Sequence, residues 1–296
     1  MEFVKTESSL SQLIWTRTGG VMKRFPKKRI FITGAGSGFG RQLSIEFAKM
    51  GWKIGAADIN IKGVDETIEL VNKNGGSAIA IPCDVTKPED FENAAKILEQ
   101  EWQGVDIVVN NAGVAAAGFM EKIPLETWEW IININFKGVI YGCRTFIPIL
   151  EKQGGGYIVN VASNAGITSL PEMSCYNATK AAVISLSETL VGELYPKNIG
   201  VTVVAPTFFK TNLHTSLKTT DARQEKMANS FFAKSKTTSE DIAKHTIKSI
   251  RKNKLYVITQ MDGKFSWFSK RMTPEFYYKC IKWGYKYKIM DKYLGM

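Results

Sequence analysis

Short, almost wholly apolar segments alternate with longer amphipathic segments through most of this 296-residue chain. The apolar segments are 29–33, 53–57, 77–81, 105–109, 156–161, 201–205 and 255–258, and the amphipathic segments are 40–50, 62–73, 88–102, 125–152, 174–195 and 239–251. Apolar strands that alternate with helices are typical of a parallel sheet with both faces covered. The sequence therefore predicts an α/β fold built on one doubly wound parallel sheet, with right-handed crossovers.

This pattern divides the chain into three parts. Residues 1–28 match no element of the pattern and are expected to form a flexible N-terminal extension or docking arm, unless Met22 is the natural start. Residues 29–260 form one domain, because no internal repeat and no low-complexity linker splits them. Residues 261–296 are expected to be a basic, aromatic-rich helical tail.

Composition and cysteine usage exclude several classes of protein. The chain is 44% hydrophobic and 23% charged, as in soluble globular proteins, and no run of eighteen apolar residues predicts a transmembrane helix. Residues 1–28 lack the apolar core of a secretory signal. Four scattered cysteines and only two histidines, His214 and His245, leave little material for a disulfide framework, a metal site or a Ser-His-Asp triad. A cytoplasmic protein without a metal is therefore expected.

A glycine-rich turn, Thr33-Gly-Ala-Gly-Ser-Gly-Phe-Gly40, joins the first predicted strand to the first predicted helix. Glycine lets a backbone turn tightly and approach a pyrophosphate, whose charge is favoured at a helix N-terminus. The spacing is G-x-x-x-G-x-G, carried by Gly34, Gly38 and Gly40, and differs from G-x-G-x-x-G. The turn predicts a dinucleotide site, with a plain strand-to-helix turn as the alternative.

Asp58 ends the second predicted strand, 24 residues after Gly34. A carboxylate there can accept hydrogen bonds from the adenosine ribose and would repel a 2′-phosphate. Neither Ser37, before Gly38, nor Ile59, after Asp58, supplies the cation that a 2′-phosphate would require. NAD(H) is therefore expected rather than NADP(H), unless Asp58 is only a loop residue.

Two further strand ends carry small or polar residues. Asp84, which ends the third strand, is placed to meet the adenine edge. Asn110-Asn-Ala-Gly113 ends the fourth strand, where small residues allow close approach and asparagine side chains can brace neighbouring strands.

Tyr176 and Lys180 stand four residues apart within a predicted helix, so their side chains share one face. A cation beside a phenol lowers its pKa, and a phenol with a lowered pKa can exchange a proton with an alcohol oxygen near neutral pH. The spacing alone is also that of an ordinary amphipathic pair.

These motifs, in this order, resemble the short-chain dehydrogenase/reductase (SDR) family, which has a Rossmann-type fold. The resemblance covers about residues 29–211 directly and extends to about 258 through the alternating pattern. It implies a tetrad in which Tyr176 is the general acid or base, Ser163 holds the substrate oxygen, and Lys180 binds the nicotinamide ribose and lowers the pKa of Tyr176. Asn135 would hold a water that links Lys180 to solvent.

The resemblance also implies a set of cofactor contacts. They are Gly34, Ser37, Gly38, Phe39, Gly40, Asp58, Asp84, Val85, Asn111, Ala112, Gly113, Tyr176, Lys180, Pro206 and Thr211. Two positions depart from the family pattern: Phe39 replaces a common isoleucine, and Thr207 replaces the glycine that usually follows Pro206. Neither departure removes a catalytic role.

The region expected to bind substrate, residues 164–175 and 208–237, is mostly apolar, although such a loop can also pack on itself as a lid. Its apolar members are Ile167, Leu170, Met173, Phe208, Phe209, Leu213, Leu217, Met227, Phe231 and Phe232. Glu172 is the nearest charge and is expected to face solvent. The sequence predicts hydride transfer between NAD(H) and an apolar secondary alcohol or ketone. The alternatives are an NADPH-dependent ketone or 3-oxoacyl reductase, and a non-catalytic nucleotide-bound scaffold or redox sensor.

The tail explains part of the net charge of +11 and suggests partners. From Pro274 it is predicted to be a helix with a basic stripe at Lys279, Lys282 and Lys286, beside an apolar stripe formed by Phe276, Cys280, Trp283, Tyr287, Met290 and Leu294. Such a helix can dock on its own protein, on a partner subunit or on a membrane surface. No nucleic-acid motif is present. The family resemblance implies a homodimer or homotetramer through residues 125–152 and 174–195.

Overall fold

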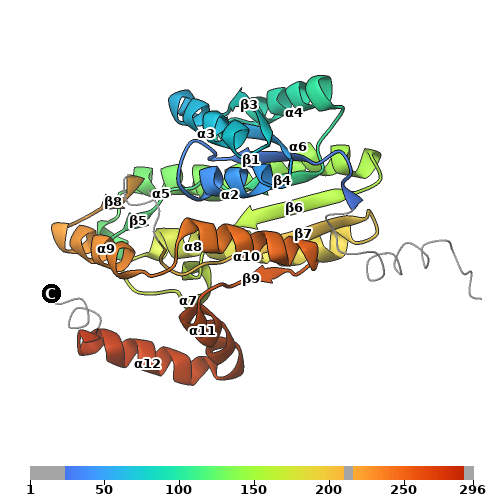
Figure 1. Cartoon of the computed structure of the whole chain (residues 1–296). Helices are drawn as coiled ribbons and strands as arrows, with labels where there is room; N and C mark the ends of the chain where they lie inside the picture. Colours follow the sequence, from blue (N-terminus) through green and yellow to red (C-terminus); the bar gives the residue numbers. More distant parts are fainter. Residues whose placement is uncertain (1–23, 210–215, 290–296) are drawn as a thin grey trace, which may run out of the picture.

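A seven-stranded parallel sheet forms the centre of the part that the structure describes, a computed structural model covering residues 24–209 and 216–289 (Figure 1). The strands lie in the order β3-β2-β1-β4-β6-β7-β9. They are β1 (Arg29–Thr33), β2 (Lys53–Asp58), β3 (Ser77–Pro82), β4 (Ile107–Asn110), β6 (Gly156–Val161), β7 (Ile199–Val204) and β9 (Tyr256–Val257). The predicted α/β fold with one doubly wound sheet is confirmed.

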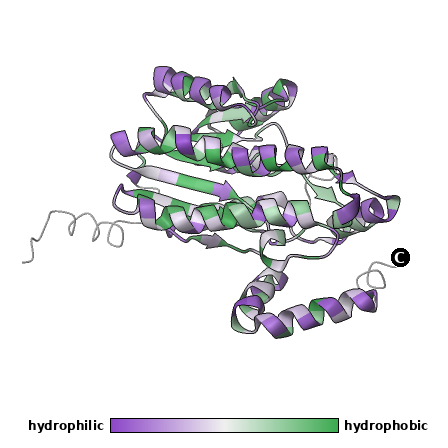
Figure 2. Cartoon of the chain, turned by 180° about the vertical axis from the view of Figure 1, so that it is seen from behind, coloured by the Kyte–Doolittle hydropathy of each residue, from purple (hydrophilic) through white to green (hydrophobic). Residues whose placement is uncertain are grey.

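Helices cover both faces of this sheet. Helices α2 (Gly38–Ala48), α3 (Ile61–Lys73) and α10 (Ser239–Arg251) pack on one face, and α4 (Pro88–Trp102), α6 (Gly138–Lys152) and α8 (Ser174–Leu194) pack on the other. Phe47 of α2 and Phe146 of α6 are fully buried in the two resulting cores. Each such side chain contributes about 1.5–3 kcal/mol through burial of its apolar surface. Figure 2 shows the hydrophobic strands between helices of mixed hydropathy.

The predicted helix over 125–152 is interrupted. It consists of α5 (Leu125–Ile132), a π-helical turn η3 (Asn133–Lys137) and α6. Single π turns inserted in a helix are frequent at functional sites, because they change the direction of nearby backbone and side-chain groups. Asn135, the predicted tetrad member, lies in the middle of this turn and is completely buried.

Several short elements lie beyond the carboxyl ends of the strands. They are β5 (Ala116–Ala117), paired with β8 (Lys218–Thr219), then η2 (Met120–Lys122), α7 (Ala165–Thr168) and α9 (Ala222–Lys234). Helix α9 is not predicted by the sequence pattern, which treats 208–237 as a loop. Asp221 begins it by accepting a hydrogen bond from the Gln224 amide at 2.9 Å.

The tail forms two helices that extend away from the sheet. Figure 1 shows α11 (Met261–Met272) and α12 (Pro274–Lys286) below β9 and α10. The predicted helix from Pro274 is confirmed, whereas α11 has no separate prediction. Among the described helices, none is both long enough and apolar enough to cross a membrane.

The last residues of the predicted N-terminal extension belong to the folded body. Phe25 is buried and packs edge-on against Trp52, with ring centroids 6.4 Å apart. Arg24 donates a hydrogen bond from Nη2 to the Asn198 carbonyl at 3.1 Å. Residues 1–23, including Met22, lie outside the described residues.

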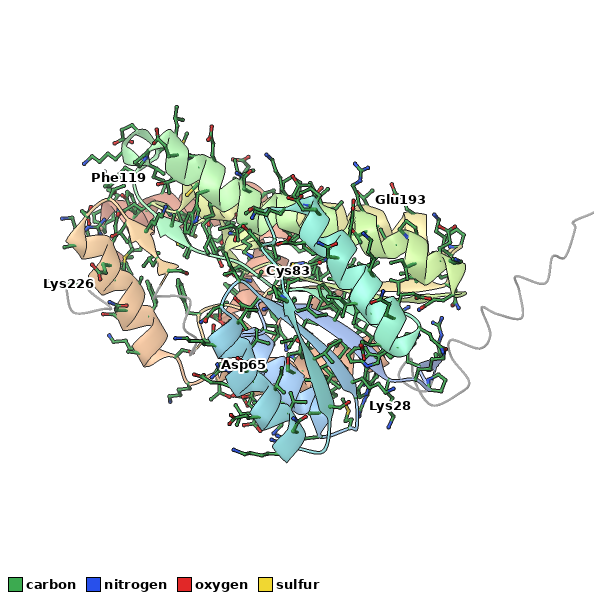
Figure 3. The ribbon with its side chains drawn as sticks, turned by 90° about the horizontal axis from the view of Figure 1, so that it is seen from above. Lys28, Asp65, Cys83, Phe119, Glu193 and Lys226 are labelled. Carbon is green, nitrogen blue, oxygen red and sulfur yellow. The ribbon has the colours of Figure 1, made fainter. Side chains whose placement is uncertain are left out.

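The carboxyl ends of the strands meet at one end of the molecule. In Figure 3, Phe119 and Lys226 lie at this end, and Lys28, which precedes β1, lies at the other. In open parallel sheets ligands bind beyond the carboxyl ends of the strands, where neighbouring connections leave in opposite directions. The predicted site residues that follow β1, β2, β3, β4, β6 and β7 are therefore brought to one end of the sheet.

Candidate active site

The turn after β1 is shaped to bring backbone amides close to a ligand. Gly34 has a φ of 66°, in the left-handed region that favours glycine. At Gly40 a Cβ atom would lie 2.2 Å from the Gly34 carbonyl oxygen and 2.6 Å from Asn111 Nδ2. Only glycine therefore lets α2 start this close to the turn. The first amides of α2 have no intrahelical partners, an arrangement that binds phosphate groups.

Other predicted members of the turn play different parts. Ser37 precedes α2 in an extended conformation as its N-cap, and Gly38 begins the helix. Phe39 is buried and packs edge-on against Phe209, with ring centroids 6.1 Å apart. Any cofactor contact made by Phe39 would therefore come from its backbone rather than its ring.

Asp58 is held facing this turn. Its Oδ2 accepts a hydrogen bond from the Gly36 amide at 2.9 Å, and its Oδ1 accepts one from the Asn60 amide at 2.9 Å. Ile59, the next residue, is exposed. The carboxylate thus faces the glycine turn, and its predicted contact with the adenosine ribose stays a prediction.

Arg41 is a cation beside the turn that the sequence reasoning did not consider. Its Nη2 donates hydrogen bonds to the carbonyl oxygens of Gly36 and Gly63 and pairs with Glu66 at 2.7 Å. Its Nε donates to the Thr67 hydroxyl at 3.0 Å. The guanidinium is therefore engaged by groups of the protein itself, which limits its use for a 2′-phosphate.

The end of β4 is braced against the end of β1. Asn111 Nδ2 donates to the carbonyl oxygens of Thr33 at 2.7 Å and Gly34 at 3.2 Å. In return, Thr33 Oγ1 accepts hydrogen bonds from the amides of Asn111 and Ala112. The predicted bracing by asparagine is confirmed, and the role of Thr33 as its acceptor was missed.

Asp84 and Val85 lie after β3, on the same side of the site. One Asp84 carboxylate oxygen accepts hydrogen bonds from the Thr86 amide at 3.0 Å and the Thr86 hydroxyl at 2.7 Å. Val85 packs close to Gly138, at the start of α6. The local turn therefore fixes the orientation of Asp84, and its predicted contact with adenine stays a prediction.

The four predicted catalytic residues are brought together at the end of β6. The Tyr176 hydroxyl is hydrogen-bonded to the Ser163 side chain. The Lys180 Nζ lies 5.8 Å from the centre of the Tyr176 ring and donates to the Val161 carbonyl at 3.0 Å. The Ser163 hydroxyl also accepts a hydrogen bond from the Ala165 amide at 3.1 Å, which holds it in place.

The side chains of Asn135 and Lys180 both lie against Gly113. A Cβ at Gly113 would lie 3.2 Å from Asn135 Oδ1 and 3.2 Å from Lys180 Nζ, so the two side chains meet at this glycine. Asn135 pairs with the backbone of Val114, accepting from its amide at 2.8 Å and donating to its carbonyl at 2.9 Å. It also donates to the Thr179 hydroxyl at 3.3 Å. Asn135 therefore anchors the site to α8, and its water-holding role stays a prediction.

The pKa of Tyr176 departs from the expectation. Burial raises its pKa above the ordinary value of 10.0, and the hydrogen bond from Ser163 opposes this only in part. The Lys180 Nζ lies 5.8 Å from the ring centre, and the effect of burial on the pKa of Tyr176 prevails. Burial also lowers the pKa of Lys180 to about 8. In this arrangement the phenol is protonated at neutral pH.

The loop after β7 carries the remaining predicted contacts. The Pro206 carbonyl accepts a hydrogen bond from the Asn164 amide at 2.8 Å. The departure at Thr207 is accommodated, because its amide donates to Gln260 Oε1 at 3.2 Å. Thr211 lies outside the described residues.

Comparison with known proteins identifies the family. The family model described as short chain dehydrogenase matches residues 28–222, which is most of the chain. The chain belongs to the short-chain dehydrogenase family. The chain is also 33% identical over 196 residues to a protein of Lactiplantibacillus plantarum named CLA biosynthesis dehydrogenase/reductase, covering 65% of this chain and 68% of that one. Three mycobacterial relatives named probable oxidoreductase EphD are longer, and the match spans 34% of their length at 36% identity.

Solved structures of short-chain dehydrogenases support the same assignment. One from Burkholderia phymatum in complex with NAD has a TM-score of 0.79 and 28% sequence identity, covering 83% of this chain and 94% of that one. A 3-ketoacyl-(acyl-carrier-protein) reductase from Brucella melitensis complexed with NADH has a TM-score of 0.70 and 27% identity, covering 79% and 97%. Short-chain dehydrogenases are oxidoreductases that bind a nicotinamide cofactor, and the glycine turn at Gly34 and Gly40 fits that cofactor's pyrophosphate.

The predicted substrate region of this short-chain dehydrogenase is apolar around Tyr176. The ring belongs to a cluster with Ala115, Ala116, Ile123, Ile131 and Cys175, against which Met173 and Leu217 pack. Other predicted members do not join it. Ile167 is buried in the main core, and Phe208 stacks on Phe231 of α9 with ring centroids 4.6 Å apart. Leu213 and the Phe232 side chain lie outside the described parts.

Glu172 does not face solvent, so this expectation is wrong. It is 8% exposed, and its backbone φ of 62° is unusual for a residue with a side chain. Its carboxylate accepts hydrogen bonds from Gln224 Nε2 and from the Tyr285 hydroxyl, each at 2.9 Å, and pairs with Arg223. Burial opposes ionisation, but these three partners together lower the pKa of Glu172. One carboxylate thus joins the loop before Tyr176 to α9 and α12.

Replacing Glu172 by glutamine should lower the free energy of unfolding by about 2 kcal/mol at neutral pH, because hydrogen bonds to a charged group contribute about 1.5–3 kcal/mol. The pKa of Glu172 is lowered in the folded chain, so its contribution is complete above the ordinary value of 4.5 and is lost as pH falls through the lowered value. The difference between the two proteins should therefore shrink in acid. Denaturant unfolding at several pH values measures this, with the exposed Glu225→Gln on α9 as control. A difference that does not change with pH would contradict the assignment.

Proposed function

We propose that this chain is an NAD(H)-dependent oxidoreductase that interconverts an apolar secondary alcohol and the corresponding ketone. The observation that carries the proposal is the buried Tyr176 hydroxyl, hydrogen-bonded to Ser163 within an apolar cluster and covered on its ring face by Lys180. A protonated phenol in such a site can donate a proton to a ketone oxygen, and its anion can accept one from an alcohol.

Each member of the tetrad has a distinct role in this proposal. Ser163 holds the substrate oxygen beside the Tyr176 hydroxyl, and Tyr176 transfers the proton. Lys180 remains mostly protonated at pH 7, since its pKa is about 8, and would bind the ribose hydroxyls of the cofactor. Asn135 positions Lys180 by fixing the backbone at Val114 and the start of α8. When bound, the nicotinamide supplies or accepts the hydride, and the protein orients the two reactants.

The cofactor preference rests on Asp58. Its carboxylate faces the glycine turn, would accept hydrogen bonds from the adenosine ribose, and would repel a 2′-phosphate. Arg41, the cation beside that turn, is engaged by Glu66 and two carbonyl groups. The similar structures with NAD and NADH support the same choice.

Replacing Asp58 by serine should reduce kcat/KM with NADH about 10–100-fold and raise it with NADPH, because hydrogen bonds to an ionised acceptor contribute about 1.5–3 kcal/mol. Turnover measured by absorbance of the reduced nicotinamide gives both values. The matched control is Asp65→Ser, an exposed residue of α3 labelled in Figure 3, which should change neither. A wild-type protein that prefers NADPH would contradict the cofactor proposal directly.

A panel of secondary alcohols and ketones tests the substrate class. We expect kcat/KM with NAD(H) to rise as apolar surface is added around the reacting carbon, because Met173, Leu217 and the Tyr176 cluster exclude water. Charged substrates of similar size should react slowly. Turnover restricted to acyl thioesters with NADPH would favour the second candidate, a 3-oxoacyl reductase, which the similarity to the Brucella melitensis enzyme keeps open.

Two further parts of the proposal concern assembly and location. By its similarity to the family, the protein would form a homodimer or homotetramer through α5, α6 and α8, whose outer surfaces include the exposed Leu125 and Val191. The four cysteines are free, which supports a reducing compartment such as the cytoplasm.

Among the described residues, no group of histidine, cysteine, aspartate and glutamate side chains could hold a metal.

A further inference from the structure

Large apolar side chains are exposed mainly on the two tail helices. Of the fourteen that are exposed among the described residues, nine lie between 261 and 289. Scattered single exposures are ordinary on protein surfaces, whereas a concentration of this kind marks a contact surface. The tail helices are therefore where a partner of this chain is to be sought.

These side chains form one exposed stripe on each helix. On α11 the stripe is Met261, Phe265, Phe268 and Met272, with relative exposures of 74%, 73%, 57% and 64%. On α12 it is Phe276, Cys280 and Trp283, and it continues to Tyr287, the residue after the helix. Both follow the same four-three-four spacing, which places their members on one side of a helix. In a globular protein such a stripe normally faces the core, and here both face outward.

The orientation of the helices is set by contacts on their other sides. On α11, Trp267 packs on Tyr256 with ring centroids 5.8 Å apart, and Lys270 donates to the Ile167 carbonyl at 2.6 Å. On α12, the Tyr277 hydroxyl donates to the Thr168 carbonyl at 3.4 Å, and the Tyr285 hydroxyl donates to Glu172. The body of the protein thus holds both helices through these contacts, while the side chains of the apolar stripes stay exposed.

The same segment is strongly basic. Between 261 and 289 the only acidic residues are Asp262 and Glu275, and the basic ones are Lys264, Lys270, Arg271, Lys279, Lys282, Lys286 and Lys288. On α12, Lys279, Lys282 and Lys286 form a row beside the apolar stripe, and all three are exposed. An apolar stripe flanked by lysines is the pattern of a helix that lies in the surface of an anionic bilayer.

We propose that the exposed faces of α11 and α12 form a docking surface for a membrane that contains anionic lipids. The apolar stripes would enter the boundary between head groups and acyl chains, and the lysine row would contact the lipid phosphates and carboxylates. A second copy of this chain fits less well, because packing this surface against itself would bring two strongly positive surfaces together. The charge therefore selects an anionic lipid surface as the partner.

This surface is next to the substrate side of the site. A cavity of about 460 Å³ lies between α12 and the loop before Tyr176, and its lining includes Phe119, Met120, Leu170 and Tyr285. The lining also includes Ser174 and Asn177 of α8 but not Tyr176, which lies on a different side of that helix. The cavity is therefore a neighbour of the Tyr176 site. If the proposed function is correct, docking would hold the loops around Tyr176 close to a bilayer in which an apolar alcohol or ketone is dissolved.

Co-sedimentation of the full chain with phosphatidylcholine vesicles, with and without phosphatidylserine, tests the docking surface. We expect binding to the phosphatidylserine vesicles, weakened by salt. Replacing Lys279, Lys282 and Lys286 together by glutamate should reduce this binding about 100-fold or more, because each basic residue near the surface contributes about 1 kcal/mol. The matched control replaces Lys73, Lys96 and Lys152 by glutamate, which changes the net charge equally on α3, α4 and α6 and should have little effect.

A second variant tests the apolar stripe. Phe276→Ala with Trp283→Ala should weaken vesicle binding at least about tenfold, because two large side chains no longer enter the lipid. Both residues are exposed, so the variant should fold and turn over a water-soluble alcohol as the parent does. Absence of vesicle binding by the full chain would overturn the proposal. A variant that changes the oligomeric state but not vesicle binding would show that the surface joins two copies instead.

The docking proposal and the proposed function can fail separately. Tyr176→Phe should bind vesicles as well as the parent protein, since docking does not require proton transfer. A chain that binds phosphatidylserine vesicles but reduces no ketone would refute the proposed function and leave the docking surface intact. A chain that turns over ketones but binds no vesicle would refute only the docking surface.

Discussion

Replacing Tyr176 by phenylalanine should lower kcat about 1000-fold or more, because a positioned general acid or base typically contributes about 10²–10⁴-fold. The substitution removes the hydroxyl that is hydrogen-bonded to Ser163 and leaves the ring with its apolar neighbours. Binding of NADH should change little, since Lys180 and the glycine turn are untouched. Steady-state rates measured by absorbance of the reduced nicotinamide give kcat. Titration followed by NADH fluorescence gives the affinity of the protein for NADH.

Tyr195→Phe is the matched control for this prediction. Tyr195 follows α8 at its other end and is 53% exposed, so loss of its hydroxyl should leave kcat unchanged. If the Tyr176 variant kept most of the parent turnover, proton transfer would have to be assigned to another group. If the parent protein itself bound NADH but turned over no alcohol or ketone, the non-catalytic scaffold would become the better description.

Replacing Gly40 by alanine should weaken cofactor binding and also destabilise the fold. The new Cβ would lie 2.2 Å from the Gly34 carbonyl oxygen, which belongs to the backbone and cannot move aside as a flexible side chain could. Either α2 shifts away from the glycine turn or the turn opens. Overpacking of this kind costs about 1–3 kcal/mol, so we expect the KM for NADH to rise about 10–100-fold and the free energy of unfolding to fall by a similar energy.

Gly192→Ala is the matched control, because it makes the same substitution at a position where the added methyl group meets no other atom. Gly192 is also in a helix, and a Cβ there would meet no atom within 4 Å. This variant should keep its KM for NADH and gain about 0.5–1 kcal/mol of stability, because alanine loses less backbone entropy in a helix than glycine. Equal effects of the two substitutions would show that the close approach at Gly40 does not shape the cofactor site.

The predicted strands are found because their signal is local. A strand buried on both faces must be apolar at nearly every position, and segments such as 53–58 and 156–161 are recognised without knowing their neighbours. Helix α9 was missed, because its apolar residues Met227 and Phe231 were interpreted as parts of a substrate-binding loop. It is stabilised by its cap at Asp221 and by the contact of Phe231 with Phe208, which lies outside the helix.

The candidate site was largely predictable for a similar reason. Gly34, Asp58, Asn111 and Ser163 each lie at or just after the end of a strand, so the parallel topology gathers them at one end, and Tyr176 lies in the first turn of α8. The sequence did not reveal Arg41 beside the glycine turn, since an arginine in the first turn of a helix has no distinctive spacing. Its engagement by Glu66 and Gly63 depends on how α3 packs against α2.

By itself, then, the sequence determined the α/β fold and the glycine turn with Asp58, because both are encoded by residue type and spacing along the chain, and its resemblance to the family named the candidate tetrad. Only the tertiary structure decided the environment of those residues. Burial raises the pKa of Tyr176 where the sequence led us to expect a lowered one. Glu172 is buried under α9 and α12, although the sequence placed it in solvent. The physical reason is that burial and electrostatic environment arise from segments distant in sequence, and no local pattern records which segments will meet.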